Sequence, residues 1–99
     1  MPLAIVDSVG FGHNATTSAT DAVAANPNRE YLIIQNKSDT RVHIGIGEDA
    51  TVDSNMFLNA NGGHFEMSRL FGNLSQGRIS VIHEGTGNKR VVGVESSHQ

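Results

Sequence analysis

The segment Arg29-Glu30-Tyr31-Leu32-Ile33-Ile34-Gln35 is followed by Asn36-Lys37-Ser38-Asp39-Thr40 and then by Arg41-Val42-His43-Ile44-Gly45-Ile46-Gly47, and this stretch decides the fold. Its two outer parts are rich in β-branched residues, and the Asn, Ser and Asp between them favour a turn. We predict an antiparallel hairpin of strands 29–35 and 41–47. Because alternate side chains of a strand share a face, the core face should carry Leu32, Ile34, Val42, Ile44 and Ile46.

The rest of the chain repeats this pattern of short apolar segments and polar turns. Further strands are predicted at 3–9, 15–24, 56–58, 64–67, 78–84 and 89–95. The turn 59–63 is expected between two of these strands, and the turn 85–88 is expected to join 78–84 and 89–95 as a second hairpin. Turns about every 8 to 12 residues are typical of sandwiches and barrels. We therefore predict an all-β fold, a single antiparallel, jelly-roll-like β-sandwich of seven to eight short strands.

The N-terminal quarter differs from the rest in charge. Residues 1–25 carry only Asp7 and Asp21 as charged side chains, whereas charges recur in nearly every later strand and turn. Residues 17–25 could form a short helical turn or an extended edge segment. We divide the chain into an N-terminal arm or edge segment (1–25), a β-sandwich core (26–95) and a polar tail (96–99).

Size and composition limit what this chain can do. Its 99 residues allow one domain, and only 37% of them are hydrophobic, so the core should be thin. Ten acidic and seven basic residues give a net charge of -3, which disfavours nucleic-acid binding through phosphates. No apolar run approaches the roughly 20 residues that span a bilayer, and no signal peptide is recognised. We expect a soluble protein made in a cytoplasm, with no membrane partner.

The residue types that carry chemistry form no motif. The sequence has no cysteine, and the spacing of its five histidines (13, 43, 64, 83 and 98) fits no metal site. His43 should point outward from its strand, and His64 and His83 should lie at strand ends or turns, so ordinary surface or turn histidines are expected. The loop 48–55 is rich in oxygen ligands but lacks the calcium-loop pattern. We predict a protein that is not an enzyme, with no catalytic, cofactor-binding or metal-binding residues.

Several apolar residues lie off the predicted core face. Tyr31 and Ile33 alternate with Leu32 and Ile34, and Ile82 and Val91 also fall on the opposite side. A monomer seldom leaves such a patch in water, so the other sheet, the N-terminal segment or a neighbouring subunit should cover it. The candidate partner-interface residues come from this face and from the N-terminal segment: Leu3, Ile5, Val6, Val9, Phe11, Tyr31 and Ile33.

Over residues 26–95, the order of these segments resembles small structural proteins of tailed bacteriophages. The resemblance is carried by Asn28-Arg29-Glu30-Tyr31-Leu32-Ile33-Ile34-Gln35-Asn36, by 42–47, by Gly62-Gly63-His64-Phe65-Glu66, by Gly77-Arg78-Ile79-Ser80-Val81-Ile82 and by the Val-rich strand 91–95.

This resemblance implies a β-sandwich virion component, a capsid decoration or cement protein that binds and stabilises neighbouring major capsid proteins. It implies a location on the capsid surface after synthesis in the bacterial cytoplasm, and homo-oligomers on the capsid lattice. The alternative is a tail-associated or fibre-associated recognition module, which would bind a host glycan or another virion protein through the loops 48–55 and 72–77.

Overall fold

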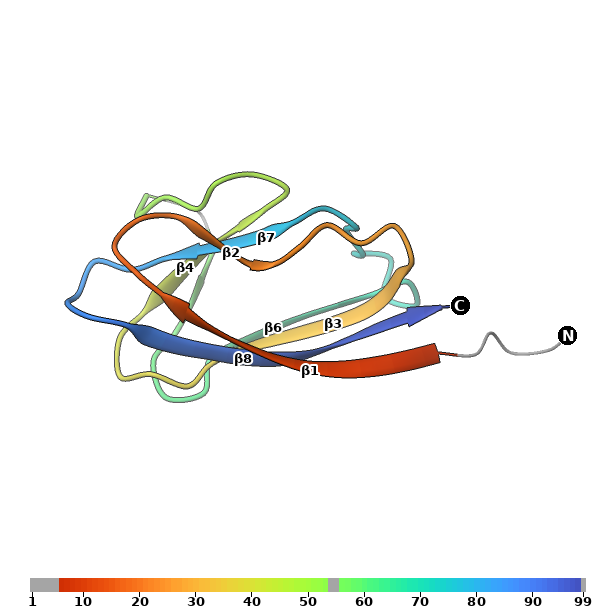
Figure 1. The fold of residues 1–99 in the computed structure, drawn as a ribbon, viewed down its shortest axis with the longest axis horizontal. Coiled ribbons are helices and arrows are strands. Elements are labelled where there is room, and N and C mark those ends of the chain that lie inside the picture. The colour runs from red at the N-terminus through yellow and green to blue at the C-terminus, as the bar shows by residue number, and fades with distance from the viewer. Residues whose placement is uncertain (1–5, 54–55, 99) are drawn as a thin grey trace, which may run out of the picture.

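The computed structural model describes residues 6–53 and 56–98 as two facing β-sheets (Figure 1). Sheet A has the strand order β1-β8-β3-β6, and sheet B has the order β2-β7-β4-β5. All neighbouring strands are antiparallel. The strands are β1 (Val6–Ala15), β2 (Thr20–Val23), β3 (Arg29–Asn36), β4 (Val42–Ile46), β5 (Phe57–Leu58), β6 (His64–Ser68), β7 (Ile79–Ile82) and β8 (Lys89–His98). The predicted β-sandwich is therefore confirmed.

The connectivity is that of a jelly roll. The chain pairs β1 with β8, β2 with β7, β3 with β6 and β4 with β5, as a single long hairpin would. Rolling that hairpin places β3 beside β8 and β4 beside β7, which completes two sheets without a parallel pair. The loop between β4 and β5 is the closed end of this long hairpin.

The predicted local hairpins are wrong, because their strands belong to different sheets. β3 lies in sheet A and β4 in sheet B, and the same holds for β6 against β5 and for β8 against β7. The segment after β3 crosses between sheets around the buried Asn36, whose Nδ2 donates to the carbonyl oxygens of Thr40 and Leu58. Leu32 and Val42 therefore both face the core, but across the sandwich interior instead of along one ladder.

The core lies between the sheets and takes its side chains from both. Its buried apolar members are Ala15, Val23, Leu32, Ile34, Val42, Ile44, Leu58, Met67, Ile79, Val81 and Val91. Val91 was expected off the core face, and this is wrong: it is fully buried, because its ladder partner Asn36 faces inward with it.

Arg29 closes one end of the sandwich and is itself fully buried. Its Nη1 donates to the carbonyl oxygens of Ser75 and Gly77 at 2.8 Å each, and its Nη2 donates to that of Ala24 at 2.9 Å. Its Nε pairs with Glu95 Oε2 at 2.7 Å. The guanidinium thereby ties the loops before β3 and β7 to β8.

The first and the last described strands, β1 and β8, both belong to sheet A. Residues 6–15 form an edge strand paired with β8 along its whole length, and β2 follows as an edge of sheet B. The expected polar tail 96–99 is wrong for residues 96–98, which continue β8; residue 99 lies outside the described residues. The last residues of β8 are held on two sides, since Ser97 lies opposite both Asp7 and Arg29. In the described ranges, no helix is long and apolar enough to cross a membrane.

Candidate docking surface

The outer face of sheet B is covered by the protein's own loop. Ser80 of β7 is fully buried there; its Oγ accepts a hydrogen bond from Ala50 N and donates one to Glu48 O, both at 2.6 Å. A Cβ on Gly45 would lie only 2.8 Å from Ala50 N, so glycine permits this close approach. The start of the β4–β5 loop therefore covers the outer face of sheet B around Ser80 and Gly45.

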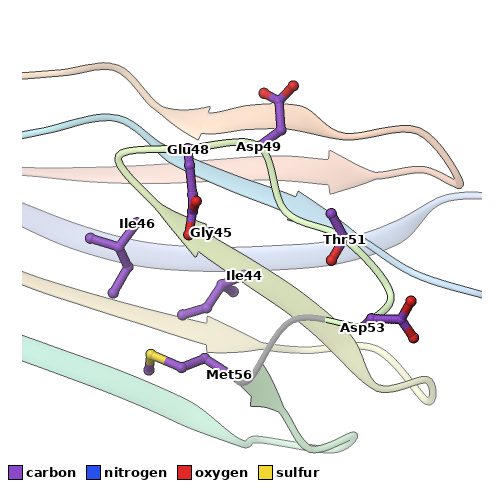
Figure 2. Close-up of a pocket in the computed structure, with 8 residues that line it drawn as sticks. All are labelled: Ile44, Gly45, Ile46, Glu48, Asp49, Thr51, Asp53 and Met56. Atoms are coloured by element: carbon purple, nitrogen blue, oxygen red, sulfur yellow. The ribbon is translucent and has the colours of Figure 1, made fainter.

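A groove of about 350 Å³ lies at this loop (Figure 2). Its walls combine apolar side chains of β4 and Met56 with polar side chains of the loop: Ile44, Gly45, Ile46, Glu48, Asp49, Thr51, Asp53 and Met56. Asp49 and Asp53 point away from Ile44 in Figure 2, and Asp49 pairs with Arg78 Nη1 at 2.8 Å. Among residues 6–53 and 56–98, no three His, Asp or Glu side chains gather as a metal site would need.

Two histidines are buried: His83, at the strand end where it was expected, and His43, on the outward side of its strand. His83 is 1% exposed; its Nδ1 accepts from Gly85 N at 3.0 Å, so its Nε2 donates to Gly87 O at 2.7 Å. The ring therefore holds the β7–β8 turn together. His43 does face outward from sheet B, but the ring of Phe57 lies against it at 5.9 Å between centroids.

The other described histidines have different surroundings. His13 Nε2 lies 2.8 Å from Thr20 Oγ1, and His98 Nδ1 lies 3.0 Å from Glu30 Oε2. His64 is exposed at the start of β6. These residues are spread over both sheets, and the structure gives them no common centre.

The outer face of sheet A has no comparable cover. Residues directly opposite in the ladders share a face, so Ile33, Val94 and Gly10 form one outward row, and Gln35, Val92 and Gly12 form the next. A shallow hollow lies here, lined by Ile33, Gln35, His64, Val92, Gly93 and Val94. Val94 is 38% exposed, and no other described segment lies over this surface.

Polar side chains frame the apolar centre of this face. Tyr31 OH donates to Glu66 Oε2 on β6, which raises the pKa of Tyr31 because the carboxylate is held beside the phenol. On the far side, Ser8 Oγ and Ser96 Oγ lie 2.8 Å apart. An apolar centre within a polar rim is the usual arrangement of a protein–protein interface.

The structure does not bring the candidate interface residues that it describes together on one surface. Tyr31 and Ile33 lie on the outer face of sheet A. Phe11 points to the other side of its sheet and packs against the core, whereas Val9 is 63% exposed. Val6 pairs with His98 in the ladder. Leu3 and Ile5 lie outside the described residues.

Sequence reasoning missed one exposed apolar feature, the turn after β6. Leu70 is 92% exposed and Phe71 is 60% exposed. The turn is well fixed, because Phe71 N donates to Ser68 Oγ and Ser68 N donates to Asn73 Oδ1, each at 2.9 Å. The sequence could have indicated this feature, because Leu70 and Phe71 form an apolar pair within a polar turn, just before Gly72, and lie outside every predicted strand.

An ion-pair cluster anchors this turn to sheet A. Arg69 Nη2 lies 2.7 Å from Glu30 Oε2, and the same carboxylate oxygen meets His98 Nδ1. Hydrogen bonds from Arg69 and then His98 lower the pKa of Glu30 from 4.5 to about 2. The turn, β3 and the end of β8 are thus held by one carboxylate.

Comparison with known proteins finds a similar fold but assigns no family. No protein-family model matches the chain, and no curated protein matches it. A solved structure of Bacillus endospore appendages, which form a family of disulfide-linked pili, has a TM-score of 0.53 at 9% sequence identity. The match covers 95% of this chain and 87% of that one. At this identity the likeness concerns the fold alone, and this chain has no cysteine for such links.

Proposed function

We propose that this protein is a non-enzymatic virion structural protein, a capsid cement or decoration subunit that docks on neighbouring major capsid proteins. The observation that carries the proposal is the contrast between the two outer faces. Sheet B is covered by its own β4–β5 loop, whereas the apolar centre of sheet A has no cover in the described part of the chain. The phage-like order of strand sequences, given above, supplies the class of partner.

The outer face of sheet A provides suitable anchors for docking. Ile33, Val92 and Val94 present β-branched side chains on a rigid sheet, and burying one such side chain fully contributes about 1.5–3 kcal/mol. A few buried anchors usually dominate an interface. Leu70 and Phe71 add a second apolar contact on a fixed turn. In this proposal the capsid surface covers both regions.

Assembly on a lattice makes a small interface sufficient. Homo-oligomers of the protein would present several copies of the docking face to a symmetric array. Once one copy binds, the next binds at a high effective concentration. A subunit of 99 residues can therefore stabilise a capsid without a large individual contact.

One observation favours the alternative of a recognition module. The two loops proposed for it begin and end side by side, because Gly47, just before the first loop, donates its N–H to Arg78 O, just after the second, at 2.7 Å. A Cβ on Gly77 would lie 3.2 Å from Gly47 Cα. Arg78 also pairs with Asp49. A glycan or another virion protein would then bind at the loop side of sheet B, next to the groove in Figure 2.

A pair of matched variants separates the two functions. Val94 on sheet A is 38% exposed, and Val52 on the β4–β5 loop is 36% exposed. We expect Val94→Glu to lower the affinity for purified capsids at least tenfold, about 1.4 kcal/mol, in a co-sedimentation titration. Val52→Glu should bind like the unmodified protein. Loss of capsid binding only in Val52→Glu, or equal binding by both variants, would contradict docking through sheet A. Glycan-array binding that Val52→Glu abolishes, with no affinity for capsids, would instead support the recognition module.

A further inference from the structure

The strand β1 leaves one edge of sheet A open along ten residues. Proteins usually protect such edges with short strands, bulges, proline or lysine. The other edge strands are shorter: β2 has four residues and a register shift, β5 has two residues, and β6 has five. β1 contains no proline or lysine, and its register with β8 is regular throughout. Its free edge is thus a ready template for another strand.

The β1 sequence complements itself when two copies run antiparallel about Gly10. In that register Asp7 lies opposite His13 of the second copy, and Val9 lies opposite Phe11. The remaining pairs set Ser8 opposite Gly12, Gly10 opposite its own copy, and the apolar Val6 opposite the polar Asn14. An apolar pair directly across a ladder, such as Val9 with Phe11, stabilises a sheet.

Shifting the centre of the pair by one residue also keeps the core-facing side chains of both copies on the same side of the joined sheet. These two registers do not pair Val9 with Phe11. Centring the pair on Val9 sets Asp7 opposite Phe11, and centring it on Phe11 sets Val9 opposite His13. Each of these registers opposes an ionisable side chain to an apolar one. The register about Gly10 therefore fits best.

The exposure of Val9 is consistent with the same pairing. Val9 is 63% exposed although its strand is fully paired with β8. Phe11 is half-buried at the neighbouring inward position of β1. In the register about Gly10, the β1 strand of the second copy would lie beside Val9 and remove part of its apolar surface from water.

We propose that a second copy of this chain binds the free edge of β1, forming a two-fold symmetric dimer centred on Gly10. The two copies of sheet A become one continuous eight-stranded sheet, with the order β6-β3-β8-β1 running into β1-β8-β3-β6 of the second copy. Such an isologous contact closes on itself and gives dimers rather than fibres. This pairing is independent of what the outer face of sheet A binds.

The absence of cysteine from the sequence allows a direct test. In the proposed dimer, residue 10 meets its own copy at about 4.5–5.5 Å between Cα atoms, within disulfide reach. A Cβ fits at Gly10, since its nearest neighbour would be Gly93 O at 3.8 Å. Ser8 is the matched control, because the two copies of residue 8 would stand four residues apart along the ladder, about 13 Å.

We expect mild oxidation to convert most Gly10→Cys protein into a covalent dimer on non-reducing gels, and little of Ser8→Cys. Adding Val9→Lys to Gly10→Cys should reduce the cross-linked fraction at least fivefold, because it places a charge on the paired edge. Circular dichroism melting of each variant verifies that it folds. Light scattering of the unmodified protein should give a dimer mass. A monomer mass at high concentration, or equal cross-linking by the two cysteine variants, would overturn the proposal.

Discussion

The ring of Phe11 in β1 occupies the space where a side chain at Gly93 in β8 would stand. A Cβ on Gly93 would lie 2.5 Å from Phe11 Cζ and 2.1 Å from the carbonyl oxygen of Ile33. Phe11 can therefore pack against the core from an edge strand. This contact makes residues 6–15 a structural part of the sandwich.

Gly93→Ala should destabilise the protein by about 1–3 kcal/mol, because the added methyl group overpacks a closed site. The measurement is the free energy of unfolding from urea titration. Gly10→Ala in the neighbouring strand is the control, since its Cβ would meet only Gly93 O at 3.8 Å, and it should stay within about 0.5 kcal/mol. Equal effects of the two substitutions would show that Phe11 does not need Gly93.

Arg29→Met should cost about 3–5 kcal/mol of unfolding free energy, the usual effect of breaking a buried ion pair from one side. The substitution leaves Glu95 and three carbonyl oxygens without their donor. Arg69→Met is the control, because Arg69 is 60% exposed and solvent screening leaves an exposed ion pair with little effect on stability. If both variants melt alike, Arg29 does not close the sandwich in the way described.

Glu30 should make stability fall in acid. Its pKa drops from 4.5 to about 2 on folding, so the unfolded chain binds the proton first and stability declines as the pH falls through this window. Glu30→Gln should flatten the plot of unfolding free energy against pH between these values. Arg69→Gln, which removes the main cause of the low pKa, should flatten it too. An unchanged slope in both variants would contradict the assigned cluster.

Leu70 and Phe71 should matter for docking and little for folding. Leu70→Ser should change the unfolding free energy by no more than about 0.5 kcal/mol, as exposed substitutions usually do, because its side chain is 92% exposed. Capsid affinity should nevertheless fall several-fold in the co-sedimentation titration. A variant with unchanged affinity would remove the turn from the docking surface.

The sequence was sufficient to predict the strands, because the side-chain alternation of 29–35 and 41–47 is a local property. It could not predict which sheet each strand joins, since a short turn suits a hairpin and a crossing equally well. The side-chain amide of Asn36, bonded to Thr40 and Leu58, marks the crossing, and Leu58 is far from it in sequence.

Of the candidate docking surface, the sequence predicted only what side-chain alternation within one strand determines. Tyr31 and Ile33 were placed off the core face by alternation alone. The burial of His43 and His83 depends on Phe57 and on the β7–β8 turn, which are tertiary contacts. The cover of sheet B likewise depends on Ser80 bonding to Glu48 and Ala50, residues some thirty positions earlier in the chain.

The proposed function requires that a phage encodes this chain, and its most direct test is mass spectrometry of the separated heads and tails of that phage, with the major capsid protein as the internal standard. A cement subunit should appear in the head fraction, at a fixed ratio to the major capsid protein. Its absence from heads, or its presence in tails alone, would contradict the account.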